Sequence, residues 1–465
     1  MTEGIKREHF EERRESPRIT TEIPITIEST VDAGLNSGKT TNISEAAIGF
    51  VLGQPLPFST KVSLFLDIRS QQIQSPLQLA WSNKDERGFL YGGRFANIKK
   101  DQLGILKEVL WLNEDFITQQ LRPIIKLLDS QPEIKGKVVD FFTKDAKNYV
   151  AQILAVKRNK DRKSPYEQKR LDEMCNKIVQ KGDEAEKVVG NKQIVKTLKR
   201  KFRLMTGTWV YQSKLMKRAF EKPRNYPGDY KMIETIYENR PVSNGIGFYF
   251  DRYFLANPYA VAVRNRKDKM VEILRNFLEE TSLPKVKVLN LACGSCREIK
   301  ELFIAPLRCQ TNLTFRCVDH DNRALEFARK SLETRPSYVT VKFLEENILN
   351  YCRAPKKYFD LLGEQNLIYS LGLADYLSDG ILKKLLQFSY HLLKPRGKLV
   401  ITHKDRSNDE QAPLPPAWFC DWNFVSRDAD QLLRLAKSVN GNYSVSMERE
   451  ASQKIIFLTL HKNSQ

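Results

Sequence analysis

Several features that mark other protein classes are missing from this sequence. Its 465 residues contain no run of 18 or more apolar residues, which argues against a transmembrane helix. The N-terminus is polar and has no apolar stretch of the kind found in signal peptides. No internal repeat and no low-complexity tract occurs. We therefore expect a cytoplasmic chain of two or three domains, each long enough to bury a core.

The seven cysteines lack the regular spacing of a disulfide framework. They are scattered along the chain, which is typical of reduced thiols in the cytosol. Cys293 and Cys296 form a Cys-x-x-Cys pair, a pattern that also occurs in redox and metal sites. No second pair is placed to complete a zinc site, so we expect no metal.

Acidic residues are too few to balance the basic ones. The chain has 76 Lys and Arg against 56 Asp and Glu, a formal net charge of +20. Residues 121–220 supply much of the excess, with 25 Lys and Arg against 11 Asp and Glu. Such a field would attract nucleic acid or an anionic membrane surface. A solvated helical surface without such a partner is the alternative, and composition leaves both open.

One segment of the C-terminal half has the pattern of a nucleotide-binding βαβ unit. An apolar strand, Val286 to Ala292, ends in the turn Cys293-Gly-Ser-Cys296 and is followed by a helix from near Glu298. A second apolar burst, Phe315 to Val318, ends on Asp319. In such a unit the backbone amides of the turn approach the ligand, and the acidic residue accepts hydrogen bonds from ribose hydroxyls.

This segment resembles motif I of class I S-adenosylmethionine (SAM)-dependent methyltransferases, which reads roughly V-L-D-L-G-C-G-T-G. Asn290 replaces the usual Asp, Ala292 the first Gly and Cys296 the third, so Gly294 is the glycine that remains. The resemblance implies SAM as cofactor. It assigns cofactor binding to Cys293, Gly294, Ser295, Asp319, Asn347 and Ile348, with Asp319 on the ribose and the last two near the adenine.

Residues 223–465 alternate between strand and helix patterns, as in a doubly wound, Rossmann-like α/β sheet. An amphipathic helix is expected over 322–333 and another over 382–393. The last strand is expected to be the antiparallel edge of the sheet. The strands expected after Asp319 are Val339 to Leu344, Tyr358 to Leu362, Pro395 to Thr402 and Lys454 to Leu460.

The first 118 residues have the pattern of a small β-barrel, with short alternating runs separated by Gly, Pro, Asn and Ser. A closing helix is expected from Lys100 to Leu121. The expected strands are Ile23 to Ile27, Ala47 to Leu52, Val62 to Asp67, Leu77 to Trp81 and Gly88 to Phe95.

Two polar clusters accompany this barrel. Arg13, Arg14 and Arg18 precede its first strand, and Asn42 and Ser44 enter its second. Over about 110 residues the pattern resembles the PilZ domain, whose marks are R-x-x-x-R and [D/N]-x-S-x-x-G. The resemblance implies that these five residues bind cyclic di-GMP, and guanidinium groups suit guanine and phosphate.

Ala47 stands where the PilZ motif has its glycine. If the turn requires a positive φ at this position, alanine would strain it by about 1 kcal/mol. We expect the chain to be multidomain, combining α+β and α/β parts: a PilZ domain over 1–120, a basic helical connector over 121–222 and a SAM-dependent methyltransferase domain over 223–465. The connector is a candidate lid or homo-oligomerisation element.

Longer motifs narrow the resemblance. Residues 225–230 (NYPGDY), 253–266, 368–377 and 420–422 together resemble bacterial methyltransferases of extracellular-factor (3-hydroxypalmitic acid methyl ester) biosynthesis. This resemblance implies O-methylation of the carboxylate of a small or fatty 3-hydroxy acid. A carboxylate is ionised at pH 7, so the site needs a cation more than a strong base. The substrate-binding candidates are Tyr226, Asp229, Arg264 and Arg266, and the catalytic candidates are Tyr369, Asp375 and Tyr376.

Two other functions remain open at this point. The first is a nucleic-acid methyltransferase with the basic connector as its phosphate-binding surface, although no Asn/Asp-Pro-Pro-Tyr motif follows the strand expected to end at Leu362. The second is a cyclic di-GMP-binding interaction protein whose methyltransferase domain is inactive. In the favoured interpretation, cyclic di-GMP moves the connector helices against the catalytic domain and so changes its activity.

Overall fold

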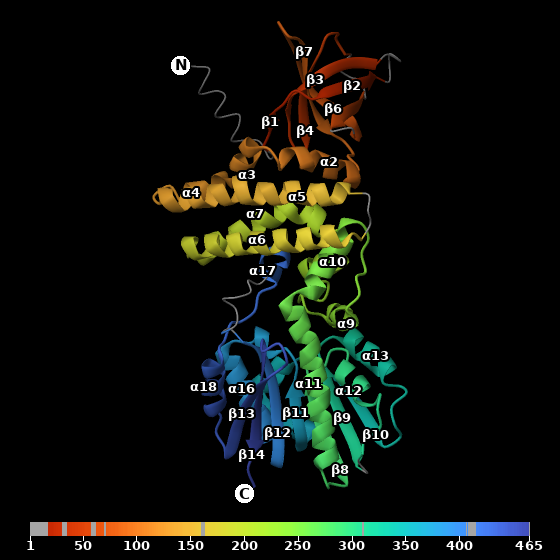
Figure 1. Ribbon diagram of the computed structural model, residues 1–465, viewed down its shortest axis with the longest axis vertical. Coiled ribbons are helices and arrows are strands. Elements are labelled where there is room, and N and C mark those ends of the chain that lie inside the picture. Colours follow the sequence, from red (N-terminus) through yellow and green to blue (C-terminus); the bar gives the residue numbers. More distant parts are fainter. Residues whose placement is uncertain are drawn as a thin grey trace. The chain divides into compact units, whose positions relative to one another are not determined.

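The computed structural model describes residues 17–29, 35–56, 62–68, 71–159, 163–308, 311–405, 407 and 415–464. The chain forms two compact units, one ending at Val210 and the other beginning at Tyr211, and Figure 1 shows the elements of both. Among the described residues, every helix is too short or too polar for a membrane span. The three-part division at residues 120 and 222 stays a prediction.

The N-terminal unit begins with a closed six-stranded barrel, as expected. Its strand order is β3-β2-β5-β6-β7-β4, β4 pairs back to β3, and the short β1 adds to β3. Alternate side chains such as Ile25, Ile27, Leu64 and Leu66 fill the interior. The strands are β1 (Ile19–Thr20), β2 (Pro24–Ser29), β3 (Leu35–Ile43), β4 (Ala47–Leu52), β5 (Val62–Ile68), β6 (Gln71–Asp85) and β7 (Gly88–Phe95).

Two features of this barrel differ from the expectation. Strand β3 was not expected, because its sequence LNSGKTTNI is polar and only two of its side chains are fully buried. The helix expected over Lys100 to Leu121 is two helices, α2 (Lys100–Leu110) and α3 (Glu114–Leu127). The break has a local cause: the Asn113 side chain accepts a hydrogen bond from the Phe116 amide and caps α3.

The rest of this unit is helical, as expected. Helices α5, α6 and α7 run side by side (Figure 1) and bury stripes that include Ile153, Leu171, Leu198 and Phe202. Their lysines face outward, so the basic charge of this segment lies mainly on helix surfaces. The elements are α4 (Pro132–Asp140), the π-helical turn η1 (Phe141–Ala146), α5 (Lys147–Arg158), α6 (Pro165–Val189) and α7 (Lys192–Val210).

The C-terminal unit is a seven-stranded sheet of order β10-β9-β8-β11-β12-β14-β13. The first five strands are parallel, and β14 runs antiparallel to both β12 and β13. This is the doubly wound order expected for a Rossmann-like sheet. The strands are β8 (Lys285–Leu291), β9 (Asn312–Asp319), β10 (Val339–Glu345), β11 (Gln365–Ser370), β12 (Leu393–Lys404), β13 (Tyr443–Arg449) and β14 (Ile455–Lys462).

Helices cover both faces of the sheet, each over its own apolar core. On one face lie α11 (Pro258–Glu280), α12 (Arg297–Leu302) and α13 (Asn322–Ser331). On the other lie α14 (Ile348–Arg353), α15 (Pro355–Leu362), α16 (Asp379–His391) and α18 (Ala429–Lys437). The remaining elements are α8 (Lys214–Glu221), α9 (Tyr230–Glu238), α10 (Ile246–Ala256), η2 (Ala374–Tyr376) and α17 (Pro415–Cys420).

Two expectations for this sheet were wrong. Residues 358–362 are part of helix α15, which Pro355 begins and Gly363 ends at φ +62°, and the strand is the fully buried β11 that follows. The short run Tyr358-Phe-Asp-Leu-Leu fits both the helical and the strand spacing of apolar residues, so its sequence alone does not distinguish the two. The last strand, β14, lies between β12 and β13 and is therefore not the edge.

Candidate functional site

The turn after β8 keeps a glycine-like backbone although two of its glycines are replaced. Ala292, Gly294 and Cys296 have φ of +54°, +54° and +52°. The left-handed conformation costs a residue with a Cβ about 1 kcal/mol or more. Strain of this kind persists where the surrounding structure imposes it, and it concentrates at ligand-binding turns. Ala292 and Cys296 therefore keep a left-handed backbone of the kind that glycine adopts most easily.

Asp319 ends β9 beside this turn. Its Oδ2 accepts a hydrogen bond from the Gly294 amide at 2.8 Å, and its Oδ1 accepts one from the Asp321 amide at 2.9 Å. The His320 ring lies 3.4 Å from Oδ1, and Asp319 raises the pKa of that imidazole. These contacts fix a nearly buried carboxylate at the carboxyl end of a parallel strand, where α/β sheets bind nucleotides.

A cavity of about 640 Å³ opens at this end of the sheet. A volume of this size suits a cofactor and a small acceptor together. Of the residues assigned to cofactor binding, all six line it. The lining includes Tyr226, Asn290, Cys293, Gly294, Ser295, Glu298, Asp319, Asn347, Ile348, Arg266, Asp375, Tyr376 and Trp422.

Asn347 and Ile348 stand at the start of α14. The Asn347 side chain accepts a hydrogen bond from the Leu349 amide at 3.0 Å and so caps this helix. The Glu346 amide donates to the Asp319 carbonyl at 2.9 Å, which ties the cap to the end of β9. Ile348 is 7% exposed and presents an apolar surface to the cavity.

Glu298 was not predicted as a site residue, yet it lies at the centre of a buried polar network. Its Oε1 accepts hydrogen bonds from Asn290 Nδ2 at 2.8 Å and from the Tyr369 hydroxyl at 2.7 Å. Burial raises the pKa of this carboxyl to about 7. Tyr369, a catalytic candidate, is fully buried and is not among the residues that line the cavity. Its hydroxyl positions the Glu298 carboxyl group through their hydrogen bond.

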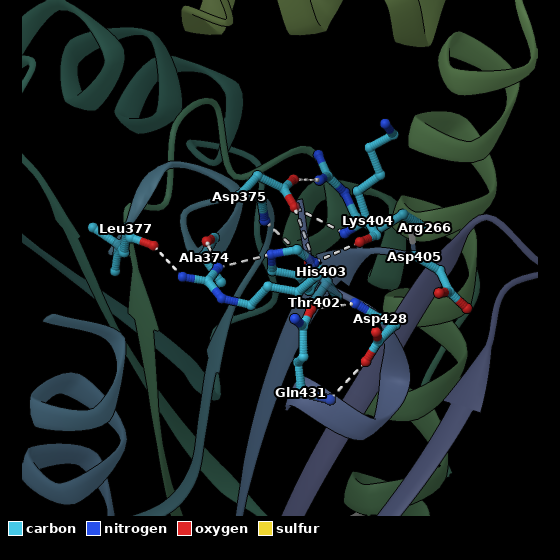
Figure 2. Close-up of polar contacts among 12 residues, drawn as sticks. Arg266, Ala374, Asp375, Leu377, Thr402, His403, Lys404, Asp405, Asp428 and Gln431 are labelled. Atoms are coloured by element: carbon cyan, nitrogen blue, oxygen red, sulfur yellow. Dashed lines mark hydrogen bonds and ion pairs between the residues drawn. The ribbon is translucent and has the colours of Figure 1, made fainter. Parts of the chain in front are cut away.

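Arg266 and Asp375 form a second polar group at the cavity (Figure 2). The Arg266 Nη1 lies 4.0 Å from Asp375 Oδ2, longer than a hydrogen bond, and its Nε has no hydrogen-bond partner in the part of the chain that the structure describes. Asp375 Oδ1 accepts from the Lys404 amide at 2.8 Å. A buried guanidinium with spare donors has unused capacity to bind an anion.

His403 and Arg427 form hydrogen bonds that hold the turn carrying Asp375. The Arg427 Nη1 donates to His403 Nε2 at 2.9 Å and to the Ala374 carbonyl at 3.1 Å. A guanidinium can only donate, so Nε2 accepts this hydrogen bond, and Nδ1 donates to the Lys404 carbonyl. Figure 2 shows His403 close to Ala374 and Asp375 of the η2 turn, and Arg427 reaches the same turn through the Ala374 and Leu377 carbonyls. The network fixes that turn against β12.

Aromatic side chains form the other wall of the cavity. Trp422 Nε1 donates to the Tyr376 hydroxyl at 2.8 Å, and the ring of Tyr226 lies 5.3 Å from that of His320. Burial raises the pKa of both tyrosines, so neither hydroxyl is a base near neutral pH. The lining also includes Tyr253, Phe254, Tyr259 and Phe424.

Two substrate-binding candidates lie away from the cavity lining. Asp229 is fully buried, caps α9 through the Met232 amide and forms an ion pair with Arg218 at 2.6 Å. Arg264 donates to the Leu255 carbonyl at 3.1 Å. Both side chains hold helices together, while Tyr226 and Arg266 are the candidates that reach the cavity.

The Cys-x-x-Cys pair belongs to the core beneath the turn. Cys293, Cys296 and Cys317 are free and nearly or fully buried, and Cys317 is the β9 register partner of Asn290. Burial raises the pKa of the Cys293 thiol. Among the described residues, no group of three His, Cys, Asp or Glu side chains is arranged to hold a metal ion. The three thiols contact one another, and hydrogen bonds from Cys293 and Cys296 lower the pKa of Cys317.

The polar motifs of the barrel lie close together where they are described. Arg18 Nη1 donates to Asn42 Oδ1 at 3.1 Å, while Arg13 and Arg14 lie outside the described residues. Ser44 is buried, and its Oγ accepts from the Ala47 amide at 3.0 Å, so it shapes the turn into β4. Ala47 is not among the residues with positive φ, which removes the strain considered for it.

Comparison with known proteins identifies the N-terminal part. Residues 12–110 match the family model of the PilZ domain, so this part of the chain is a PilZ domain. No curated protein matches the chain.

Solved structures resemble the chain at low identity. A possible exported protein from Bordetella parapertussis is 17% identical and covers 51% of this chain and 80% of its own, with a TM-score of 0.41. The N-methyltransferase NodS from Bradyrhizobium japonicum WM9, in complex with S-adenosyl-L-homocysteine, is 15% identical and covers 50% and 97%, with a TM-score of 0.31. The magnesium protoporphyrin IX methyltransferase from Synechocystis PCC 6803 with bound SAM is 10% identical and covers 44% and 83%, with a TM-score of 0.32.

Proposed function

We propose that the C-terminal unit is a SAM-dependent methyltransferase. The observation that carries this proposal is the left-handed turn at Ala292, Gly294 and Cys296, whose Gly294 amide donates to the Asp319 carboxylate in the lining of the cavity. The turn offers backbone groups to the amino acid part of the cofactor, Asp319 offers its carboxylate to the ribose, and Ile348 offers an apolar surface to the adenine. The resemblance of residues 286–298 to methyltransferase motif I supports the same cofactor.

SAM, when bound, supplies an electrophilic methyl group, so the chain itself must orient the acceptor and exclude water. Buried aromatic side chains exclude water from the cavity. Arg266, with its spare donors, is suited to orient the acceptor. We propose an acceptor with a free carboxylate and an apolar body, in agreement with the resemblance to the 3-hydroxypalmitic acid methyl ester family. Such an acceptor needs no general base, and the raised pKa of the tyrosines agrees with that.

The test uses the full chain and methyl-labelled SAM. Saturated and 3-hydroxy fatty acids of several lengths are incubated with the protein, and the products are analysed by mass spectrometry. We expect labelled methyl esters from the free acids and none from acids that are already esterified. Replacing Arg266 with Gln should lower kcat/KM for the acid by about 100-fold or more, because a charge-assisted hydrogen bond is lost. If the protein binds SAM but forms no ester, the cofactor assignment stands and a carboxylic acid acceptor is rejected.

We propose that the PilZ domain binds cyclic di-GMP through Arg18 and Asn42, together with Arg13 and Arg14. The direct contact of Arg18 with Asn42 supports a shared site, and guanidinium groups suit guanine and phosphate. Ser44 supports the site indirectly by shaping its turn. Calorimetry with cyclic di-GMP tests this, and an Asn42→Ala variant should bind at least 10-fold more weakly.

A further inference from the structure

Glu298 is a buried carboxylate for which the described part of the chain shows no ion pair. The residue is 3% exposed and lines the cavity beside the 292–296 turn. Both of its described side-chain hydrogen bonds come from neutral donors, Asn290 and Tyr369, and both reach the same oxygen, Oε1. A buried carboxylate normally has a cationic partner. A cavity-lining carboxylate without one is suited to a cation that arrives with a ligand.

The two donors come from adjacent strands at one level of the sheet. Tyr369 of β11 and Asn290 of β8 are register partners, so their side chains reach Oε1 from neighbouring positions. They immobilise the carboxyl group through Oε1, and its own backbone amide is a third donor to it, while no described side chain donates to Oε2. Glu298 lines the same cavity as Gly294 and Ser295, so its carboxyl group is available to a ligand that approaches the 292–296 turn.

This arrangement explains Asn290 as well. An aspartate at this position would place a second carboxylate within hydrogen-bond distance of Glu298, and the two could not both ionise. An asparagine donates to Glu298 instead, at 2.8 Å. Beside Asp319, the turn thus has a second acidic group, which lies in the first turn of α12 and not at the end of β8.

We propose that Glu298 binds the α-ammonium group of the cofactor's amino acid part, replacing the carboxylate that Asn290 does not supply. The inference rests on the proposed SAM site. The ligand chemistry is specific: an ammonium next to an adenosine, as in SAM and S-adenosylhomocysteine. Adenosine derivatives without the amino group lack the partner and gain nothing from Glu298.

The test is a thermodynamic cycle on the full chain by calorimetry. One side of the cycle is Glu298→Gln, which removes the charge but keeps an oxygen that accepts from both Asn290 and Tyr369. The other side replaces S-adenosylhomocysteine with its deaminated analogue. Each single change should weaken binding about 10- to 100-fold, and the two together should cost little more than one. Glu326→Gln, which makes the same charge change at an exposed position of α13, should leave binding unchanged.

A third probe, 5′-methylthioadenosine, lacks the whole amino acid part and should bind the native chain and the Gln variant equally. This equality also shows that the variant is folded around the adenosine site. Equal binding of S-adenosylhomocysteine to the two proteins would overturn the role of Glu298 and leave the cofactor assignment intact. Equal binding of the deaminated analogue and S-adenosylhomocysteine to the native chain would overturn it without any variant. Failure of the native chain to bind any of the three would reject the SAM site and this inference together.

Discussion

At the scale of single residues, Ala292 carries strain that a glycine would not. Its φ of +54° is costly with a Cβ, and its methyl group is only partly buried. We predict that Ala292→Gly raises the free energy of unfolding by about 0.5–1 kcal/mol, measured by urea unfolding. Ala328→Gly in helix α13 is the matched control and should lower it by about 1 kcal/mol or more. A loss of stability in the first variant would mean that the turn is not strained.

Glu298 gives a pH-dependent prediction with a definite sign. In the folded chain it keeps its proton up to about pH 7, whereas the unfolded chain releases it near the ordinary value of 4.5. The folded state therefore binds more protons between these values, and the Glu298 contribution to stability falls as pH rises through them. We predict that Glu298→Gln is more stable than the native chain at pH 8, by at most about 3 kcal/mol. The advantage should vanish near pH 4.

The measurement is the native-minus-variant difference in unfolding free energy from pH 4 to 8. Tyr369, Tyr237 and Cys317 are the titratable neighbours of Glu298. Hydrogen bonds from Cys293 and Cys296 lower the pKa of Cys317, so its titration overlaps this window. The series is therefore repeated with Cys317→Ser in both proteins. A difference that stays constant with pH in both backgrounds would contradict the prediction.

The sequence predicted roles for the turn and Asp319, which stay predictions, and it gave no indication of the position of Glu298, because that position depends on the path of the backbone. Asn290 differs visibly from the aspartate of the methyltransferase motif. Nothing in the sequence spacing, however, shows that the side chain of Glu298, eight positions later, hydrogen-bonds to it. That hydrogen bond depends on the left-handed residues between Asn290 and Glu298. A positive φ cannot be predicted from alanine or cysteine, because these residues rarely adopt it. The same limit applies to Asp229 and Arg264, whose residue types suit a binding site while their neighbours make them structural.

At the scale of elements, the turn between β3 and β4 shapes the proposed cyclic di-GMP site, and Ser44 holds this turn. The buried Oγ of Ser44 accepts from the Ala46 and Ala47 amides at 3.3 and 3.0 Å. We predict that Ser44→Ala destabilises the N-terminal unit by about 1–2 kcal/mol, because two buried amides lose their acceptor. Chemical unfolding checks this, with Ser37→Ala on the exposed side of β3 as a nearly neutral control. Equal stability of both variants would show that Ser44 does not hold the turn.

Strands were predicted correctly where apolar and aromatic residues dominate their sequence. The strands Ala47–Leu52 and Gly88–Phe95 have the bounds expected from their composition. Strand β13 (Tyr443–Arg449) was not predicted, because it lies at the sheet edge and its sequence is mostly polar. Strand β3 was not predicted because its sequence is also polar. These strands form through pairing with their sequence neighbours β14, β2 and β4, and their own composition does not show that pairing.

At the scale of the whole molecule, the two proposed ligand sites belong to different units. The described part of the cyclic di-GMP site comes from residues 18–49, and the cavity is lined entirely by residues 224–424. Within the N-terminal unit, the Gln119 side chain of α3 donates to the Arg18 carbonyl at 3.2 Å, so the barrel motif is tied to the helices that follow. A ligand that moves Arg18 would therefore act on α3 first.

We predict that the two sites are thermodynamically coupled. Linkage requires that cyclic di-GMP change the affinity for S-adenosylhomocysteine by the same factor by which S-adenosylhomocysteine changes the affinity for cyclic di-GMP. Couplings of this kind are typically about 5-fold or more. Calorimetry of each ligand with and without the other measures both factors on the full chain. Asn42→Ala should remove the effect of cyclic di-GMP while leaving S-adenosylhomocysteine binding itself unchanged. Identical affinities in the presence and absence of the second ligand would show that the two units bind independently, and the PilZ domain would then need a role other than control of cofactor binding.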